Sequence, residues 1–423
     1  MTTPSNAQSL PEETDIVIGP REQLFHLIAE ASEIEHTLMC SYLYAAFSLK
    51  TGDTGLSPTE AKAVDGWRQS ILSVAIEEMS HLLLAANLSI ALGGRPYFGR
   101  PNFPVPPGYF PSGIVVKLTP FSRETLDHFI FVERPQGHQL ADGEGFEHEQ
   151  DYQREEAYEG LMPSVQDYRT IGWLYEALRA NLIASARRIG ERSLFIGPIA
   201  GQVGSEAIDM QGVSTITDLE SALSAIDTIV EQGEGSPADR DDSHYHRFLS
   251  IKNEYDALLA GNPEFQPAWP CASNPVMRRP PEPEDKVFID DPQAARVLDF
   301  ANATYGLLLR LLVQAFGRFS ERPSEGQARC LRAAVELMHI LSSAASHLTR
   351  MPASPDHPGI NAGMTFTMLR SVEPLFTGTA ENQLIGERLS ELARGARYVG
   401  SIVAPLADLE ARLTKLAEIF ERR

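Results

Sequence analysis

The chain has few cysteines and a shortage of basic residues, and each shortage excludes a class of protein. Cys40, Cys271 and Cys330 form no CxxC pair and are odd in number, so neither a disulfide framework nor a cysteine zinc site is indicated. Lysine and arginine number 36 against 57 acidic residues, which gives a net charge of -21 and repels nucleic acids and anionic lipids. Residues 1–15 lack a basic segment followed by an apolar one, and no apolar run approaches the roughly 20 residues of a membrane helix. We therefore expect a cytoplasmic protein that binds neither nucleic acid nor membranes.

The composition is otherwise that of a folded protein with a large core. The 423 residues are 43% hydrophobic and 22% charged, which favours two or three packed units. We expect a flexible N-terminus over 1–20, a helical bundle over 21–260, a proline-rich strap over 261–292 and a C-terminal helical unit over 293–423.

Apolar residues recur at helical spacing through most of the chain, whereas prolines separate the helical stretches. Six prolines between positions 95 and 113 predict a long crossover loop, followed by a short strand over 114–117. The predicted helices of the bundle are a short one at 123–131 and four long ones at 21–50, 57–92, 167–188 and 218–232. Past the strap, helices are predicted at 292–319, 325–350 and 382–420. The predicted fold is therefore all-α, a four-helix bundle with a crossover loop and an additional C-terminal helical unit.

The first helix carries a carboxylate on its apolar face. Glu35 lies seven residues after Ile28 and four after Ala31, with Leu38 on the same face. A buried carboxylate is costly unless it is paired, protonated or bound to a metal. Either a tyrosine or arginine partner or a metal therefore accounts for an inward Glu35. Tyr42, on the same stripe, would place a phenol beside such a site and is the predicted catalytic residue.

The second helix contains Glu78-Met79-Ser80-His81, whose two ends lie on its apolar stripe. A carboxylate and an imidazole one turn apart reach a single metal, and the glutamate can bridge to a second metal. The spacing also occurs by chance on surface helices, so it gains weight only from the residues on the other helices.

The third and fourth helices offer further ligands. Glu176 shares a face with Trp173, and Glu234 follows the apolar stripe of the fourth helix. His244 or His246 is expected to supply the imidazole that accompanies Glu234, although both also suit ordinary loop or capping positions.

The four successive long helices thus offer a glutamate, then Glu-x-x-His, then a second glutamate, and then a glutamate with a histidine. This is the ligand set of a carboxylate-bridged dinuclear iron or manganese site in a ferritin-like bundle. The predicted metal ligands are Glu35, Glu78, His81, Glu176, Glu234 and His244. A rival for the last pair is Glu336 with His339, which has the i, i+3 spacing within the C-terminal unit.

Several short motifs resemble the ferritin-like iminophenylpyruvate dimer synthase family. They are Ala31 to His36, Ala75 to His81, Leu92 to Pro96, and Gln232 to Gly235 followed by Ser243 to Tyr245. Known members of that family act in bacterial bisindole pathways such as those to violacein and rebeccamycin, and they are much longer chains. The resemblance implies the ferritin-like bundle, an oxidative role and the six ligand positions, but no particular substrate.

The leading hypothesis is an O2-dependent oxidase or oxygenase with two iron ions, with manganese as the other metal that these ligands suit. Its substrate is expected to be a small, aromatic, amino-acid-derived metabolite, with the aromatic crossover loop as one wall of the pocket. The alternative is a ferroxidase or iron-binding protein without an organic substrate, and a third reading is a metal-free interaction protein. Apolar residues on the C-terminal helices serve either the internal core or a homo-oligomer interface, and periodicity does not separate the two.

Overall fold

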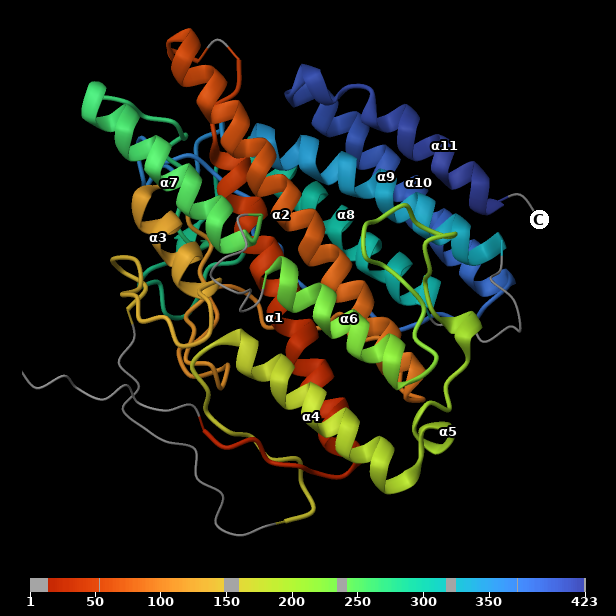
Figure 1. Ribbon diagram of the computed structural model, residues 1–423. Helices are drawn as coiled ribbons and strands as arrows, with labels where there is room; N and C mark the ends of the chain where they lie inside the picture. The colour runs from red at the N-terminus through yellow and green to blue at the C-terminus, as the bar shows by residue number, and fades with distance from the viewer. Residues whose placement is uncertain are drawn as a thin grey trace, which may run out of the picture.

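The computed structural model describes residues 14–52, 54–147, 160–233, 242–316, 325–370 and 372–421, and it confirms an all-α protein (Figure 1). Its centre is a pair of long packed helices, α1 (Arg21–Ser48) and α2 (Pro58–Ala91). Ser57 caps α2 by accepting from the Glu60 backbone N–H, while the Glu60 side chain accepts from the Ser57 N–H, a reciprocal cap that fixes where the helix begins.

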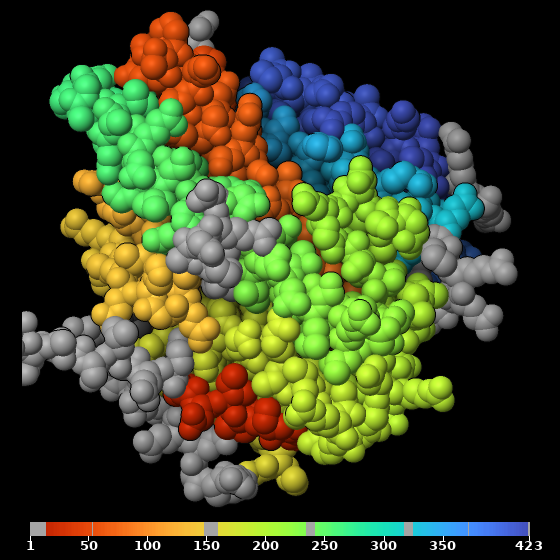
Figure 2. Space-filling model, in the orientation of Figure 1, coloured from red at the N-terminus to blue at the C-terminus, as the bar shows by residue number. Residues whose placement is uncertain are grey.

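Four further helices surround this pair. Helix α4 (Ile171–Ile189) packs on α1, and α6 (Leu219–Gln232) packs on both α4 and α2. The short α3 (Arg123–Val132) packs against α7 (His244–Gly261), which also contacts α2. In the space-filling view, α6 and α7 cover much of this face, and α2 is visible between them and the C-terminal helices (Figure 2).

The C-terminal half adds α8 (Pro292–Phe316), α9 (Glu325–Leu348), α10 (Thr379–Ile402) and α11 (Leu409–Glu421). The minor elements are α5 (Glu191–Leu194), η1 (Ile199–Gly201), η2 (Ala404–Leu406) and the parallel pair β1 (Pro275–Val276) and β2 (Val287–Phe288). One continuous hydrophobic core includes residues from both the N-terminal and the C-terminal helices.

Two predictions of secondary structure are wrong. The single helix expected over 382–420 is two helices, because Pro405 lies between them in η2 and lacks the N–H that a continuing helix needs. Residues 114–117 form no strand. Within that segment, the carbonyl of Val116 accepts a hydrogen bond from the Val105 N–H.

Helix α2 is long and apolar enough to cross a membrane by length and composition. Of its most apolar stretch, 72% is buried inside the protein. Burial of this kind is what the core helix of a packed bundle requires, so the hydrophobicity of α2 is accounted for by its central position.

A buried polar junction connects α1 to α8. The Tyr305 hydroxyl lies 2.6 Å from His36 Nε2, and the His36 Nδ1 lies 3.0 Å from the Phe98 carbonyl oxygen. Arg100, which is only 7% exposed, donates to the Tyr305 hydroxyl at 3.0 Å and to the Phe366 carbonyl. Side chains and backbone from both halves of the chain therefore satisfy one another inside the core.

Candidate metal centre

Five ionisable side chains with no measurable exposure meet between α1, α2, α3 and α7. Glu35 comes from α1, Glu78 and His81 from α2, Glu133 from the C-cap of α3, and His244 from the first turn of α7. They form two groups that share Glu78, and in each group three potential ligand atoms lie within 4.8 Å of one another. We call Glu35, Glu78 and His81 cluster A, and Glu78, Glu133 and His244 cluster B.

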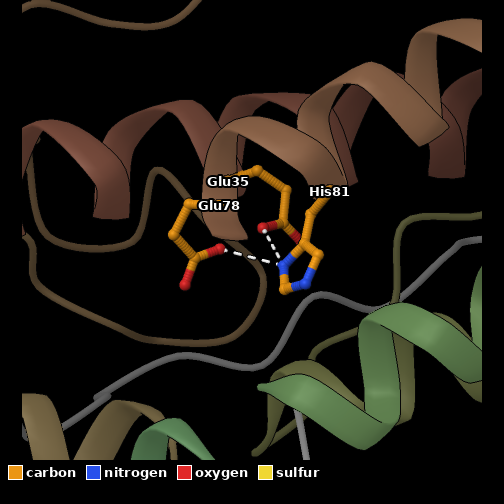
Figure 3. Close-up of side chains that lie close together, drawn as sticks. All are labelled: Glu35, Glu78 and His81. Atoms are coloured by element: carbon orange, nitrogen blue, oxygen red, sulfur yellow. Dashed lines mark hydrogen bonds and ion pairs between the residues drawn. The ribbon is translucent and has the colours of Figure 1, made fainter. Parts of the chain in front are cut away.

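In cluster A, the histidine contacts both carboxylates (Figure 3). His81 Nδ1 lies 3.3 Å from Glu35 Oε2 and 3.1 Å from Glu78 Oε2, so the imidazole bonds carboxylates of both central helices. Because Glu78 and His81 are one turn apart on α2, both point at the same spot on α1.

Cluster B contains buried ion pairs whose atoms are not aligned for hydrogen bonds. His244 Nδ1 lies 3.0 Å from Glu78 Oε1 and 3.5 Å from Glu133 Oε2, yet none of these three buried atoms has a hydrogen-bond partner. Glu133 is moreover placed at the C-cap of α3, where the helix dipole disfavours a negative charge. A cation coordinated by the three atoms would remove both penalties, so the residues fit a metal ion.

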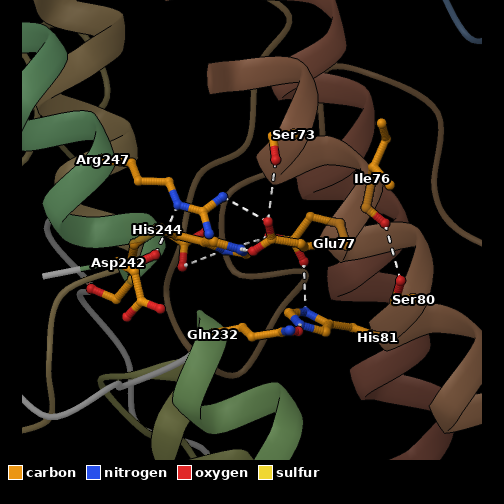
Figure 4. A network of polar contacts seen from close by, with 12 residues as sticks. Ser73, Ile76, Glu77, Ser80, His81, Gln232, Asp242, His244 and Arg247 are labelled. Carbon is orange, nitrogen blue, oxygen red and sulfur yellow. Dashed lines mark hydrogen bonds and ion pairs between the residues drawn. The ribbon is translucent and has the colours of Figure 1, made fainter. Parts of the chain in front are cut away.

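The outer nitrogen of each histidine is held by a side-chain oxygen (Figure 4). His81 Nε2 lies 3.0 Å from Gln232 Oε1, and His244 Nε2 lies 3.0 Å from Glu77 Oε2. Since these oxygens accept a hydrogen bond, each Nε2 carries a proton, and Nδ1 is the nitrogen presented to the cluster. A hydrogen bond from the nitrogen that faces away from a metal orients a metal-binding histidine and raises the basicity of its other nitrogen.

Two tyrosines hold the outer carboxylates. The Tyr42 hydroxyl donates to Glu133 Oε1 at 2.5 Å, and the Tyr175 hydroxyl donates to Glu35 Oε1. Each carboxylate thus keeps its other oxygen for the cluster, Glu133 Oε2 in cluster B and Glu35 Oε2 in cluster A. The two tyrosines therefore orient the carboxylates of Glu133 and Glu35 in the same way.

Burial and mutual proximity shift the protonation of these groups strongly. Burial, reinforced by the Glu78 charge, raises the pKa of Glu35 to about 8. Burial opposes a charge on His81, but the carboxylates of Glu35 and Glu78 raise its pKa to about 10. The pKa of His244 is likewise raised despite its burial, because Glu133 and Glu78 face it. Without a metal, the centre holds protons where a cation's charge would otherwise be.

The structure brings together four of the six predicted ligands: Glu35, Glu78, His81 and His244. Glu234 lies outside the described residues. His246, the alternative to His244, has its Nδ1 3.0 Å from the Ser243 hydroxyl instead. The rival pair is also elsewhere, because Glu336 forms a 2.6 Å ion pair with Arg412 and His339 is exposed.

The inward orientation predicted for Glu176 is wrong. Its side chain is 46% exposed and forms an ion pair with Arg179 at 3.5 Å, on the outer face of α4. The residue that enters the centre from α4 is the preceding one, Tyr175, which is 1% exposed. Because α4 is apolar around much of its circumference, periodicity did not distinguish the two orientations.

Glu133 is the carboxylate that sequence reasoning missed. It follows Leu126, Phe129 and Ile130 at the i, i+3, i+4, i+7 spacing of one helix face, and those three residues are buried. The same test that identified Glu35 would therefore have found it. The sequence predicted that this short helix ends at 131, so Glu133 was not expected on its buried face.

Comparisons with known proteins agree with this architecture. A family model described as Ferritin-like matches residues 28–253. A crystal structure of a ferritin-like protein from Caulobacter vibrioides superimposes with a TM-score of 0.50 at 17% identity, over 83% of this chain and all of that chain. At that identity the likeness concerns the fold alone.

Two curated relatives match most of the chain. The dichlorochromopyrrolate synthase of Lentzea aerocolonigenes is 28% identical over 90% of this chain, and the 2-imino-3-(indol-3-yl)propanoate dimerase of Chromobacterium violaceum is 24% identical over 76%. The matched regions span only 39% and 31% of those proteins. Both belong to the bisindole group that the sequence motifs resemble.

Proposed function

Because the chain belongs to the ferritin-like family, we propose that it is an O2-dependent oxidoreductase of secondary metabolism with a dinuclear metal centre. Glu35 and His81 would hold one ion and Glu133 and His244 the other, with Glu78 contributing to both groups. Iron is the proposed metal, with manganese as the alternative. The observation that carries the proposal is cluster B, where two buried carboxylates and a buried imidazole converge without an aligned hydrogen bond among the three facing atoms. When bound, such a metal pair supplies multi-electron oxidation by O2.

The residues of the chain have distinct tasks in this proposal. Glu35 and Glu133 would each help to hold one ion, and the hydroxyls of Tyr175 and Tyr42 respectively orient their carboxylates. His81 and His244 present Nδ1 to the centre, because Gln232 and Glu77 hold their outer nitrogens. Tyr42 therefore acts through Glu133, and we assign it a positioning role in place of the catalytic one predicted from sequence.

We propose an aromatic amino-acid-derived metabolite as the substrate. The support comes from the two relatives, whose names specify chromopyrrolate-type and indolyl imine chemistry. Of the aromatic crossover residues, Phe98, Phe103 and Phe110 are buried in the core. Tyr97 and Tyr109 are partly exposed and donate to Glu33 Oε1 at 2.8 and 3.3 Å. The crossover thus contributes mainly packing, and its wall toward a substrate would be limited to these two tyrosines.

The test begins with metal analysis of protein purified from iron- and manganese-supplemented cells. About two metal ions per chain are expected in the native protein and fewer than half as many in Glu78→Gln. Glu176→Gln, the same change on the outer face of α4, is the matched control and should retain full metal content. Failure of the native protein to bind either metal after anaerobic reconstitution would overturn the proposal.

The second measurement is O2 consumption by the iron-loaded protein with and without an indolyl imine generated from indole-3-pyruvate and ammonia. Substrate-dependent consumption in excess of the bound iron supports an organic substrate. Consumption limited to the oxidation of the added Fe²⁺, and unchanged by the imine, would instead establish an iron-oxidising protein.

A further inference from the structure

Clusters A and B differ in how their ligand atoms are satisfied, and we infer that they take up metal unequally: cluster B fills first and holds its ion more tightly. The inference rests on the proposed function, since it concerns the same dinuclear centre. It adds an order of assembly and assigns Glu77 as the positioning residue that creates the difference.

The first observation is the hydrogen bonding within each cluster. In cluster A, His81 Nδ1 already bonds Glu35 Oε2 and Glu78 Oε2, so an incoming cation has to replace hydrogen bonds that exist. In cluster B, Glu78 Oε1, Glu133 Oε2 and His244 Nδ1 have no hydrogen-bond partner. These atoms are in ion-pair contact, His244 Nδ1 with Glu78 and Glu133, but are not aligned for hydrogen bonds. A cation there therefore displaces no aligned hydrogen bond, which makes binding more favourable in cluster B.

The second observation is the chemistry behind each histidine. His244 Nε2 is held by a carboxylate, Glu77, whereas His81 Nε2 is held by the neutral amide of Gln232, at the same distance of 3.0 Å (Figure 4). A carboxylate partner makes the imidazole a stronger electron donor than an amide does. Glu77 is itself fixed in place by Arg247, 2.6 Å away, and by the Ser73 hydroxyl at 3.3 Å.

Both observations point in the same direction, although they involve different atoms. One concerns the inner nitrogen of each histidine and the carboxylates that face it, and the other concerns the outer nitrogen. A chain with a single cation therefore holds it between α2, α3 and α7, and cluster A is completed only at higher metal concentration. At low metal concentration the chain then holds one ion, in cluster B, and at higher metal concentration it holds two.

The order of filling is tested by titrating the metal-free full chain with Mn²⁺, using calorimetry for affinity and electron paramagnetic resonance for free and bound ion. We expect two steps, the first at least tenfold tighter, and an uncoupled manganese signal at one ion per chain. Glu133→Gln should abolish the tight step and leave one weaker step. Glu35→Gln should abolish the weak step and leave the tight one.

The role of Glu77 is tested by exchanging the two partners. Glu77→Gln should weaken the tight step by about 10- to 100-fold with the weak step unchanged. Gln232→Glu should raise the affinity of the weaker step and so reduce the difference between the two affinities. The control is Glu254→Gln on α7, whose carboxylate accepts from Trp67 Nε1 at 2.7 Å and should alter neither step. Retention of both steps in that variant shows that a carboxylate-to-amide change on α7 does not by itself disturb the centre.

Two equal steps in the native chain, or loss of the tight step in Glu35→Gln, would overturn the inference while leaving the dinuclear proposal intact. An unchanged tight step in Glu77→Gln would remove Glu77 from the explanation. Two unequal ions in a protein that consumes no O2 would refute the proposed function and leave the order of filling standing. Failure to bind Mn²⁺ at all would refute both.

Discussion

Replacing Tyr175 by phenylalanine removes one hydroxyl from the centre and little else. The ring is 1% exposed, and phenylalanine keeps its shape, so the change leaves no large cavity. What is lost is the hydrogen bond to Glu35 Oε1, which leaves a buried carboxylate free to rotate away from cluster A. We expect the variant to bind the second, weaker Mn²⁺ ion less well than the native chain.

The size of the effect follows from two independent magnitudes. Because a bound cation displaces the proton of Glu35, the carboxylate is charged in the metal-bound state, where its hydrogen bond contributes about 1.5–3 kcal/mol. Loss of a contact that orients a metal ligand costs about 10- to 100-fold in affinity. The latter range corresponds to about 1.4–2.7 kcal/mol, so the two agree. The expected result is therefore a 10- to 100-fold weaker second step in a Mn²⁺ titration, with the first step unchanged as an internal check on folding.

The matched control is Tyr168→Phe. Its hydroxyl also donates to a glutamate of α1, Glu30 Oε1 at 2.7 Å, but that glutamate belongs to neither cluster. This variant should keep both affinities within about twofold, which is well inside the effect of losing a ligand-orienting contact. If Tyr175→Phe does the same, Tyr175 does not orient Glu35 and the reasoning is refuted.

Three other outcomes are expected. The affinity of the metal-free protein for Mn²⁺ should rise with pH, because a cation must displace protons from Glu35, whose pKa is raised to about 8, and from His81, whose pKa is raised to about 10. Uptake of Mn²⁺ at pH 7 in weak buffer should therefore release protons to an indicator dye. Uptake without proton release would contradict this reasoning. Glu176→Gln should leave the calorimetric Mn²⁺ isotherm unchanged, since its side chain is 46% exposed on α4, whereas an altered isotherm would place that carboxylate near the centre. Gly363→Ala should lower the free energy of unfolding by about 1–3 kcal/mol in a urea titration, because its Cβ would overlap the buried Tyr44 hydroxyl, and an unchanged midpoint would show that the tyrosine moves without cost.

Much of the fold was predictable from sequence because the helices are long and their apolar periodicity is strong. The stop at Gly93-Gly94 and the proline-rich crossover gave the boundaries of α2 within a residue or so. The errors came where the signal is local. Pro405 interrupts a region that otherwise reads as one helix, and 114–117 is a β-prone run without a neighbouring strand to pair with.

For the centre, the inward orientation of a side chain was predicted correctly where a carboxylate interrupts a clear apolar stripe. Glu35 and the pair Glu78 and His81 stand out in this way, because burial of a charged group is costly and needs a reason. Prediction failed for Glu176, because one face of α4 is not distinguishable from the next. Glu133 was missed because ligands were expected only on the long helices, whereas Glu133 lies at the end of the short helix α3.

The junction between His36, Arg100 and Tyr305 limits how the chain can be divided. Shortening the protein to α1–α7 would remove the Tyr305 hydroxyl of α8 that both Arg100 and His36 contact. It would also expose to water the core residues that pack against the C-terminal half, and that loss of buried apolar area is destabilising. His36 also immediately follows Glu35, so the disturbance would begin one residue from cluster A. The helices that carry clusters A and B are therefore not a portable module, and transplanting this candidate centre into another scaffold would require α8 to go with it.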